Sequence, residues 1–587
     1  MRVLTLITFT IATLSSQFLM AAEQTHENAV SRAVPEAFTG MNYQKSAIAS
    51  EAMVSAANPH AVDAGLAMLA QGGNAIDAAV AIQLVLTLVE PQSSGIGGGA
   101  FLLWYDAKTK QMTSFDGREK APSAATPELF FENGKPVRWI DAVIGGRSVG
   151  VPGVLHMLHQ VHEKKGQLEW HKLFQPAIKL AENGFRVSPR LAKLVAMHMN
   201  PGLARLSPAK EYFYPNGKAI KEGSLLVNKP YANTLKLIAK NGIKAFYNGI
   251  VAKQIVEAVN NAPVAPGLLA LEDLENYQSI ERQVECLDYT KRDSSFDICS
   301  MGPPSSGGIT VLQILAMLEP FDFTGLNFFS AKTLHLYSQA ARLAFADRDQ
   351  YIADSDFVDV PTLAMLDKQY LTKRSALINE KRDMGKATAG IIGRKEYAAN
   401  VSIAQPNTSH LSIVDKEGNA ISMTTSIEMG FGSTVMVCGF LLNNQLTDFS
   451  LAPKVNGKLV ANRVEANKRP RSSMTPVIVM KDDELFAVLG SPGGSRIINY
   501  VGYALLGLLE FEMDLDDVVN GPRFSNRNGY TTLEKDSILA QYKTQLEQMG
   551  HTIRLSELTS GIHAIIKTKD GWKGAADPRR EGTAKGL

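Results

Sequence analysis

The chain has 587 residues, of which 45% are hydrophobic and 20% charged, and its formal net charge is +2. This composition is ordinary for a globular protein, and the charge gives no reason to expect a nucleic-acid partner. The length corresponds to roughly three or four domains of average size, yet no low-complexity linker divides it. We therefore expect one large unit.

Residues 1–22 are typical of an export signal. Arg2 precedes a mostly apolar stretch from Val3 to Met20, and Ala21-Ala22 supplies small residues for cleavage. The alternative is a membrane anchor, but the stretch is short and contains several Thr and Ser residues. We therefore expect a periplasmic or secreted protein.

The first half of the chain predicts mainly helices. Asn58-Pro59 is a typical helix start, and Gly72-Gly73 a typical end. Asn74 begins a second helix over 75–89, which is apolar nearly all round and should be buried. Paired strands are expected at 100–105 and 111–115. Most segments from 151 to about 351 have a helical period, including 331–346.

Three cysteines fit an exported protein that does not depend on disulfides for its fold. Cys286 and Cys299 lie on two expected strands, at equal distances from a turn at Arg292-Asp293. A cross-strand disulfide there would add about 3 kcal/mol of stability. Cys438 is left over, and we expect it to be a small core residue.

The last third of the chain predicts strands at 411–414, 420–426, 477–480, 485–489 and 562–567, with a helix at 495–508. These elements favour a layered architecture with sheet packed on sheet. Thr408 lies in a short polar break ahead of the first of these strands. If the chain is cut just before Thr408, one residue carries a hydroxyl and a free α-amine, which is a nucleophile with its own base.

Other catalytic patterns fit their context less well. The stretch Gly95 to Ala100 matches a dinucleotide fingerprint, but a helix precedes it and a strand follows, the reverse of what that site needs. These glycines instead indicate a close backbone approach. Ser148 in Gly146–Gly150 matches G-x-S-x-G and is the second candidate nucleophile, although its flanking elements are poor. Ser207 to Lys210 matches S-x-x-K without the accompanying K-T-G.

The turn from Gly490 to Ser495 lies between an expected strand and an expected helix. Its backbone N–H groups can hold an anion, which makes it a candidate oxyanion hole. The alternative is a simple tight connection. No His/Cys cluster has the spacing of metal ligands, so we expect no metal and no cofactor.

Taken together, these segments resemble the γ-glutamyltransferases (glutathione hydrolases) of the N-terminal nucleophile hydrolase superfamily. The resemblance covers most of the chain from about Ala47. The motifs that carry it run in order: Gly73–Val80, Glu90–Gly99, Pro303–Gly308, Leu442–Gln445, Asp448–Ser450, Lys468–Pro470, Ser472–Met474 and Gly490–Arg496.

The resemblance implies an α+β fold, a four-layer αββα sandwich formed jointly by two chains cut from one precursor. Self-cleavage before Thr408 would give a large chain, 23–407, and a small chain, 408–587. Thr408 would then form a γ-glutamyl ester with substrates such as glutathione. Water, or the amine of an acceptor amino acid or peptide, would release the acyl group.

The resemblance also implies the remaining site residues. Gly493 and Gly494 would form the oxyanion hole, and the Ser426 hydroxyl would support Thr408. Arg118 would bind the substrate α-carboxylate, for which a forked guanidinium is suited. Two further groups read the same end of the substrate: Ser472 and Ser473 would donate to the carboxylate, and Gln445 and Asp448 would accept from the α-ammonium.

Two features depart from the family pattern. Ser426-Ile427-Glu428 stands where many members have Thr-x-Asn, so Glu428 puts a carboxylate in the substrate site. The segment 449–471 is shorter than in members with a long lid, which predicts a more open site. Both features favour, as an alternative, a related amidase with a different acyl group, similar to cephalosporin or glutaryl acylases. A third hypothesis is an unprocessed periplasmic amino-acid-binding protein.

Overall fold

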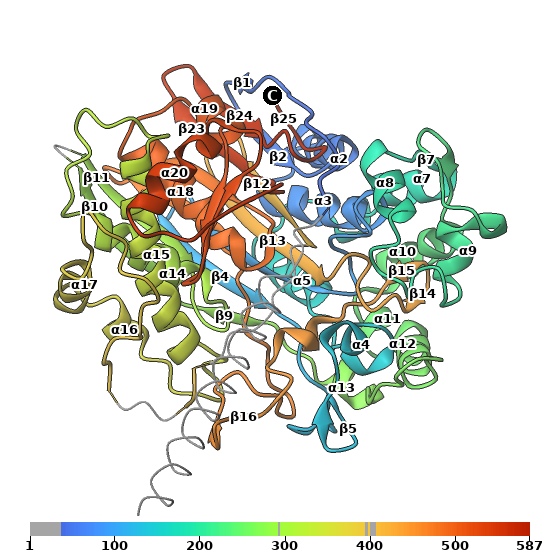
Figure 1. Ribbon diagram of the computed structural model, residues 1–587. Helices are drawn as coiled ribbons and strands as arrows, with labels where there is room; N and C mark the ends of the chain where they lie inside the picture. The colour runs from blue at the N-terminus through green and yellow to red at the C-terminus, as the bar shows by residue number, and fades with distance from the viewer. Residues whose placement is uncertain (1–36, 292–293, 394–396, 400–406) are drawn as a thin grey trace, which may run out of the picture.

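The computed structural model describes residues 37–291, 294–393, 397–399 and 407–587. The predicted export signal and the turn residues Arg292 and Asp293 lie outside these ranges. Two seven-stranded sheets pack face to face, and helices cover their outer sides (Figure 1). Within the described ranges, none of the helices has the length and apolar character that a membrane span requires.

The sheet that contains Thr408, here called the Thr408 sheet, is antiparallel throughout. Its strands are, in spatial order, β25 (Thr583–Gly586), β2 (Met53–Ala56), β12 (Asn407–Val414), β13 (Ala420–Glu428), β3 (Gly99–Asp106), β4 (Gln111–Gly117) and β9 (Ile280–Arg282). β12 therefore lies between β2 and β13, and the C-terminal strand β25 pairs with β2.

The second sheet, here called the facing sheet, is also antiparallel throughout. Its strands are, in spatial order, β1 (Ala47–Ala49), β24 (Gly571–Ala576), β23 (His563–Thr568), β19 (Glu484–Gly490), β18 (Val477–Lys481), β11 (Ser294–Met301) and β10 (Val284–Lys291).

Helices form the two outer layers. The Thr408 sheet is covered by α2 (Pro59–Ala70), α3 (Ala75–Val89) and α5 (Val154–Lys165), and beyond them lie α7 (Gln175–Asn183), α8 (Pro189–Ala196), α10 (Lys229–Asn241) and α12 (Ile250–Asn260). The facing sheet is covered by α14 (Gly307–Leu318), α15 (Ala331–Tyr351) and α18 (Ile497–Leu509). The predicted αββα sandwich is therefore confirmed.

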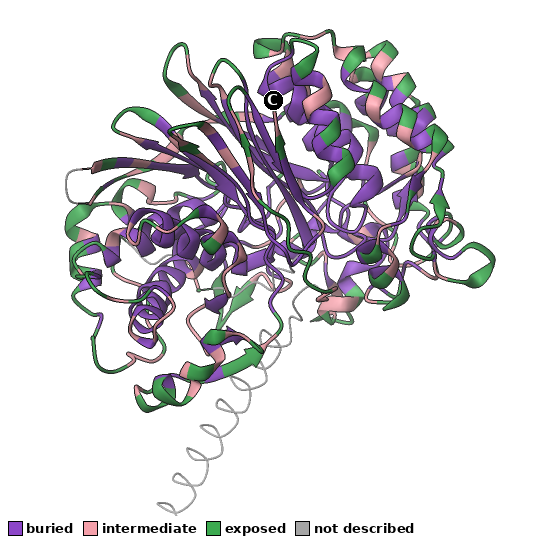
Figure 2. Ribbon diagram, turned by 90° about the horizontal axis from the view of Figure 1, so that it is seen from above, coloured by how far each residue is buried: buried purple, intermediate pink, exposed green. Residues whose placement is uncertain are grey.

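Alternation along the strands separates the layers of the core. Leu411 and Ile413 of β12 belong to the cluster that contains the α3 side chains. Val414 instead packs with Ile478 and Val488 of the facing sheet. Figure 2 shows this burial continuing through both sheets and the inner helices. Every residue of β12 and β13 is buried, because both faces of these strands are covered.

The predicted helix starts are confirmed. The Asn58 side chain accepts from the His60 N–H at 3.0 Å, with Pro59 in the first turn of α2. The Asn74 side chain caps α3, and Asp77 Oδ2 accepts a hydrogen bond from the Asn74 N–H at 2.9 Å. Every residue of α3 is buried, as its apolar sequence predicts.

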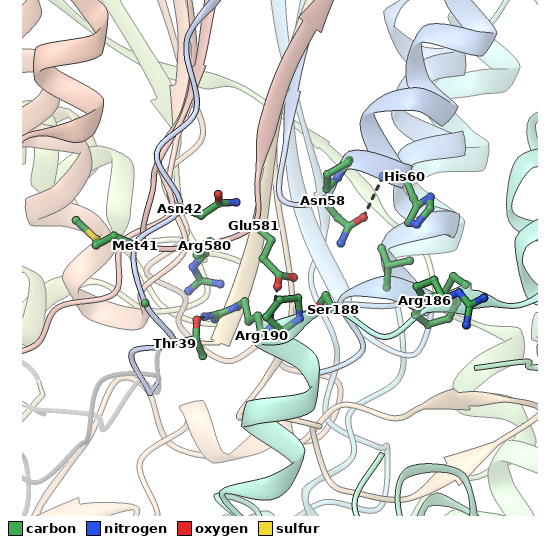
Figure 3. Close-up of a pocket in the computed structure, with 15 residues that line it drawn as sticks. Thr39, Met41, Asn42, Asn58, His60, Arg186, Ser188, Arg190, Arg580 and Glu581 are labelled. Atoms are coloured by element: carbon green, nitrogen blue, oxygen red, sulfur yellow. Dashed lines mark hydrogen bonds between the residues drawn. The ribbon is translucent and has the colours of Figure 1, made fainter. Parts of the chain in front are cut away.

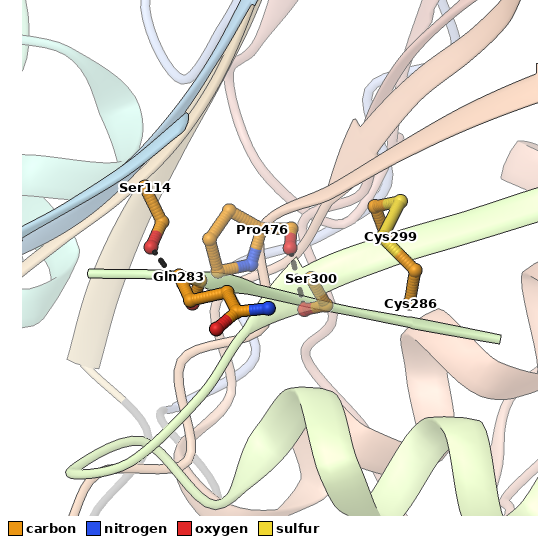
Figure 4. The surroundings of a disulfide bond; sticks show 6 residues. All are labelled: Ser114, Gln283, Cys286, Cys299, Ser300 and Pro476. Atoms are coloured by element: carbon orange, nitrogen blue, oxygen red, sulfur yellow. Dashed lines mark hydrogen bonds between the residues drawn. A yellow bond between two sulfur atoms is a disulfide. The ribbon is translucent and has the colours of Figure 1, made fainter. Parts of the chain in front are cut away.

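The predicted disulfide is confirmed. Cys286 and Cys299 are direct partners in the β10–β11 ladder and are joined (Figure 4). The prediction for Cys438 is wrong, because this residue lies half-buried at the edge of the core. Its thiol donates to Gln254 Oε1 at 2.9 Å, a polar contact that a core position would not offer.

Candidate active site

Thr408 lies inside a strand, not in the break that the sequence predicts. β12 begins at Asn407, and Thr408 is only 3% exposed. The polar residues that follow are buried but hydrogen-bonded: Ser94 Oγ donates to Ser409 Oγ at 3.2 Å, and His410 Nδ1 lies 2.9 Å from Thr424 Oγ1. These bonds allow a polar segment to continue a buried strand.

A β-bulge surrounds the predicted nucleophile. The β12–β13 register shifts between Asn407 and Ser409, so two residues of β13 lie opposite Thr408. One of them, Ser426, donates from Oγ to the Asn407 carbonyl at 2.9 Å, and Thr408 Oγ1 donates to Ser426 Oγ at 3.4 Å. The hydroxyl of Thr408 and the carbonyl of Asn407 therefore share one hydrogen-bond partner, the hydroxyl of Ser426.

The glycines from Gly95 to Gly99 let the backbone approach this bulge. A Cβ on Gly98 would lie 2.2 Å from the Ser426 carbonyl oxygen, and one on Gly97 would lie 2.2 Å from that of Leu441. No side chain fits at either position. The prediction of a close backbone approach is confirmed, and these glycines do not form a strand-to-helix phosphate loop.

The turn with Gly493 and Gly494 lies at the same end of the sandwich as Thr408. It joins β19 to α18, and both glycines have positive φ, +137° and +57°. Gly490, at the start of this turn, abuts the His410 ring, since a Cβ there would lie 2.3 Å from His410 Cε1. The glycine N–H groups therefore lie at the start of a helix, where anions are favoured.

Arg118 joins three segments that are far apart in the sequence. It follows β4, is 1% exposed, and donates from Nη2 to Asp448 Oδ2 at 2.5 Å. It also donates to the carbonyls of Pro470 and Arg471, at 3.1 and 3.2 Å. Gln445 Nε2 donates to the same Asp448 oxygen at 2.7 Å. Arg118, Gln445 and Asp448 thus form one buried cluster beside the Ser472 segment.

A second carboxyl group lies next to this cluster. Glu119 is fully buried, and its Oε2 is 3.8 Å from Arg118 Nη1. Burial raises the pKa of Glu119 to about 8, although Arg118 opposes the rise. The Glu119 carboxyl therefore holds a proton more readily than a free carboxyl does, and Asp448 is the carboxylate at hydrogen-bond distance from Arg118.

The two predicted serines are held by the Pro303–Gly308 motif. The Ser306 N–H donates to the Ser472 carbonyl at 2.8 Å. Arg348 of α15 donates from Nη2 to Ser473 Oγ at 2.9 Å and from Nε to Ser306 Oγ at 2.8 Å. Sequence reasoning missed Arg348, because nothing in its helical segment marks it as different from other arginines.

Glu428 is buried at the end of β13, with a positive φ of 79°. Its Oε2 accepts from Asn444 Nδ2 at 2.5 Å, and its N–H donates to Ser426 Oγ at 2.9 Å. Asn444 directly precedes Gln445 in the chain. The carboxylate is therefore oriented toward the loop that carries the predicted ammonium-binding residues.

Sequence reasoning also missed Arg580. This buried side chain donates from Nη1 to the Thr408 carbonyl at 3.2 Å. Burial lowers the pKa of Arg580 to about 10, while the carboxyl of Glu90 opposes the shift. Burial in turn raises the pKa of Glu90 to about 7. The charged run Asp577-Pro578-Arg579-Arg580-Glu581 was the available signal.

The other serine candidates have structural roles. Ser148 lies in a buried 3-10 turn (Gly146–Ser148), and its hydroxyl donates to the Val143 carbonyl at 2.6 Å. It is not on a strand-to-helix elbow. Ser207 Oγ donates to Glu211 Oε1 at 2.8 Å on the surface. Neither serine is arranged as a nucleophile.

The predicted site residues are enclosed in the uncut chain. Among the predicted site side chains, Asp448 is 6% exposed and Ser473 is 5%. The segment 449–471 is short, but Asn462 ties it down at both ends. Asn462 Nδ2 donates to the Asp448 carbonyl at 2.7 Å, and its Oδ1 accepts from the Arg471 N–H at 2.9 Å. A short lid held in this way still covers the cluster.

An αββα sandwich with a threonine near the start of a central strand defines the class of N-terminal nucleophile hydrolases. A sequence profile of the family described as Gamma-glutamyltranspeptidase matches residues 61–587. The chain therefore belongs to the γ-glutamyltranspeptidase family.

Individual relatives agree with this assignment. The chain is 39% identical over 559 residues to the glutathione hydrolase proenzyme of Bacillus subtilis (strain 168), with 93% of each chain covered. The fold is similar to that of cephalosporin acylase from Bacillus halodurans, with a TM-score of 0.81, 26% identity, and 94% and 98% of the two chains covered. The gamma-glutamyltranspeptidase of Helicobacter pylori gives a TM-score of 0.53 at 34% identity, covering 59% of this chain and 94% of that one.

Proposed function

We propose that this chain is a self-processing γ-glutamyltransferase and glutathione hydrolase whose nucleophile is Thr408. The observation that carries the proposal is the shared contact of Ser426 Oγ with Thr408 Oγ1 and the Asn407 carbonyl. This contact brings a hydroxyl next to the peptide bond that must break. Membership of the family supports the same reaction.

Processing begins when Thr408 Oγ1 attacks the carbonyl carbon of Asn407. The hydroxyl proton is lost, the C–N bond breaks, and the nitrogen of Thr408 takes up a proton to become a free α-amine. Water then hydrolyses the resulting ester between Asn407 and Thr408. Two chains remain, 23–407 and 408–587, and the ladders of β12 with β2 and of β13 with β3 hold them together.

In the cut enzyme, the α-amine of Thr408 acts as the base, since such a group has a pKa of about 8. It takes the hydroxyl proton while Oγ1 attacks the γ-carbonyl of the substrate. The N–H groups of Gly493 and Gly494 stabilise the oxyanion. The amine then protonates the leaving group, and water or an acceptor amine releases the γ-glutamyl group.

The cluster around Arg118 recognises the glutamyl end of the substrate. The guanidinium binds the α-carboxylate, and the Ser472 and Ser473 hydroxyls donate to the same group. Asp448 and Gln445 accept from the α-ammonium. Arg118 and Asp448 contact each other at 2.5 Å. A bound substrate would replace this ion pair by two, one between Arg118 and its α-carboxylate and one between Asp448 and its α-ammonium. This exchange offsets the cost of entering a buried site.

The test is the variant Thr408→Ala. It should remain one continuous chain and show no hydrolysis of a γ-glutamyl anilide, whereas the wild type gives two bands on a denaturing gel. Thr425→Ala is the matched control, because Thr425 is a buried β13 threonine whose Oγ1 has no hydrogen-bond partner among the described residues. Cleavage and normal turnover in Thr408→Ala would contradict the proposal.

A second candidate function is an amidase that takes a different acyl group. The buried Glu428 carboxylate and the likeness to cephalosporin acylase favour it. A carboxylate near the α-carboxylate of glutamate would repel it, whereas a glutaryl group carries no α-charge. Comparing kcat/KM for a γ-glutamyl and a glutaryl anilide decides between the two. A higher value for the glutaryl compound favours this second function.

We also propose that the protein is exported, because residues 1–22 have the pattern of a signal peptide. Fractionation of cells that express the full chain should place the activity outside the cytoplasm. Deletion of residues 2–20 should return it there.

A further inference from the structure

Several buried arginines lie outside the proposed substrate contacts, and most of them face carboxyl groups. Arg190 and Arg580, for example, line a cavity of about 470 Å³ that Glu581 also lines (Figure 3). Arg348 of α15 is different, because its guanidinium contacts two serine hydroxyls as well as one carboxylate. One of these serines, Ser473, belongs to the proposed substrate site. Arg348 therefore has a direct connection to substrate recognition.

Every nitrogen of the Arg348 guanidinium is engaged. Nε donates to Ser306 Oγ at 2.8 Å, Nη1 to Asp349 Oδ1 at 2.6 Å, and Nη2 to Ser473 Oγ at 2.9 Å. The residue is only 3% exposed. A planar group that is bonded in three directions has little freedom to turn, so it holds both serines in fixed places. An ammonium on a flexible stem has no such fork and could not make the same contacts.

These bonds determine where the serine protons point. A guanidinium only donates, and a hydroxyl has one proton to give. Ser306 Oγ accepts from Arg348 and donates its own proton to the Ser472 carbonyl at 2.6 Å. Ser473 Oγ also accepts from Arg348, but its proton has no acceptor among the residues that the structure describes. The Ser473 hydroxyl is therefore left with a proton to donate to a ligand.

The available proton lies beside the Arg118 cluster. Arg118 Nη2 donates to the carbonyl of Arg471, two residues before Ser473 in the chain, at 3.2 Å. Arg471 Nη1 in turn donates to the Arg348 carbonyl at 3.2 Å. A hydroxyl that accepts from a cation is polarised and donates more strongly to an anion. The local arrangement therefore favours a negatively charged acceptor at Ser473.

We propose that Arg348 is a positioning residue that directs the Ser473 hydroxyl toward the substrate α-carboxylate and so selects substrates that carry this group. The inference rests on the proposed function, which assigns the α-carboxylate to Arg118, Ser472 and Ser473. Arg348 does not touch the substrate itself. It occupies the acceptor side of Ser473, so the serine proton points away from it. Without Arg348, the Ser473 proton is free to turn elsewhere, and the carboxylate is bound more weakly.

Calorimetric titration of the purified protein with glutamate and with 4-aminobutyrate tests the proposal, because these ligands differ only in the α-carboxylate. Arg348→Met should weaken glutamate binding by about tenfold, the usual worth of a charge-assisted hydrogen bond. Binding of 4-aminobutyrate should not change. Arg348→Lys keeps the charge opposite Asp349, so it preserves the fold if the methionine does not. It should also weaken only glutamate binding, by a smaller factor.

Arg342→Met is the matched control for the loss of a buried arginine. Arg342 lies on the same helix, is also 3% exposed, and donates to both oxygens of Asp383 at 3.0 and 2.9 Å. Its contacts include none of the proposed substrate-binding residues. Arg342→Met should therefore leave the binding of both ligands as in the wild type. A loss of glutamate binding in this variant equal to that in Arg348→Met would overturn the proposal.

A double-mutant cycle with Ser473→Ala tests whether Arg348 acts through this serine. If it does, the double variant should bind glutamate about as weakly as the weaker of the two single variants. Losses that multiply would overturn the proposal, as would an equal loss for glutamate and 4-aminobutyrate or unchanged glutamate binding in Arg348→Met. Turnover is measured separately. Protein that binds glutamate selectively but does not hydrolyse a γ-glutamyl anilide would contradict the proposed function, not the role of Arg348.

Discussion

The hydroxyl of Ser426 offers a sharp test of the processing step. Its Oγ donates to the Asn407 carbonyl at 2.9 Å, which is the carbonyl that Thr408 must attack. This bond polarises the carbonyl and strengthens as negative charge develops on its oxygen. Loss of one such donor costs about 3–4 kcal/mol of barrier. Ser426→Ala should therefore slow self-cleavage by a factor of about 10² to 10³.

The assay follows the appearance of the small chain on denaturing gels after synthesis of the precursor. Ser422→Ala is the matched control, because Ser422 lies on the same strand, is fully buried, and donates to the Leu489 carbonyl at 3.0 Å. Both variants lose a buried hydroxyl, so they share the general cost to stability. Equal cleavage rates in Ser426→Ala and the wild type would refute the role of this hydrogen bond.

Three further predictions concern substrate binding and stability. Arg118→Lys should raise KM for γ-glutamyl donors by about tenfold or more, since lysine loses the forked contact, while cleavage of the precursor continues. Replacing Cys286 and Cys299 together by Ala should lower the free energy of unfolding by about 3 kcal/mol, measured by denaturant titration of the uncleaved precursor. Glu90→Gln should change the dependence of stability on pH. Burial raises the pKa of Glu90 from 4.5 to about 7, so its folded form retains a proton that the unfolded form has lost. Its contribution to stability is complete below pH 4.5 and is lost as pH rises from there through 7, so the variant should melt higher than the wild type at pH 8 but equally at pH 4.

For each of these predictions, one result would contradict the reasoning. An unchanged KM in Arg118→Lys would mean that Arg118 does not bind the substrate α-carboxylate through a forked contact. A wild-type free energy of unfolding in the double cysteine variant would mean that the disulfide does not constrain the unfolded chain. If the difference in melting temperature between Glu90→Gln and the wild type is the same at both pH values, Glu90 is charged in the folded protein.

Local signals in the sequence were sufficient for much of the fold. Asn58, Pro59 and Asn74 mark helix starts through bonds within one turn, so no distant residue is needed to predict them. The Cys286–Cys299 pairing follows from strand register around a single turn. The start of β12 could not be found in this way. Its polar residues are stabilised by partners such as Ser94 and Thr424, which belong to other segments.

Contacts between distant segments limited the prediction of the site even more. The resemblance to a family identified Arg118 and Asp448, but their direct contact joins residues 330 positions apart and is visible only in the fold. The length of the segment 449–471 did not reveal that Asn462 anchors it at both ends. Arg580 was missed because its bond to the Thr408 carbonyl joins β12 to the segment between β24 and β25, 172 positions further along the chain.

The most direct test of the account is N-terminal sequencing, together with the intact mass, of the fragments in the purified active protein. The account predicts a small chain that begins with Thr408-Ser409-His410, accompanied by a large chain that ends at Asn407. Full activity in a preparation that contains only the continuous polypeptide would contradict it. A new terminus at any other residue would contradict it equally.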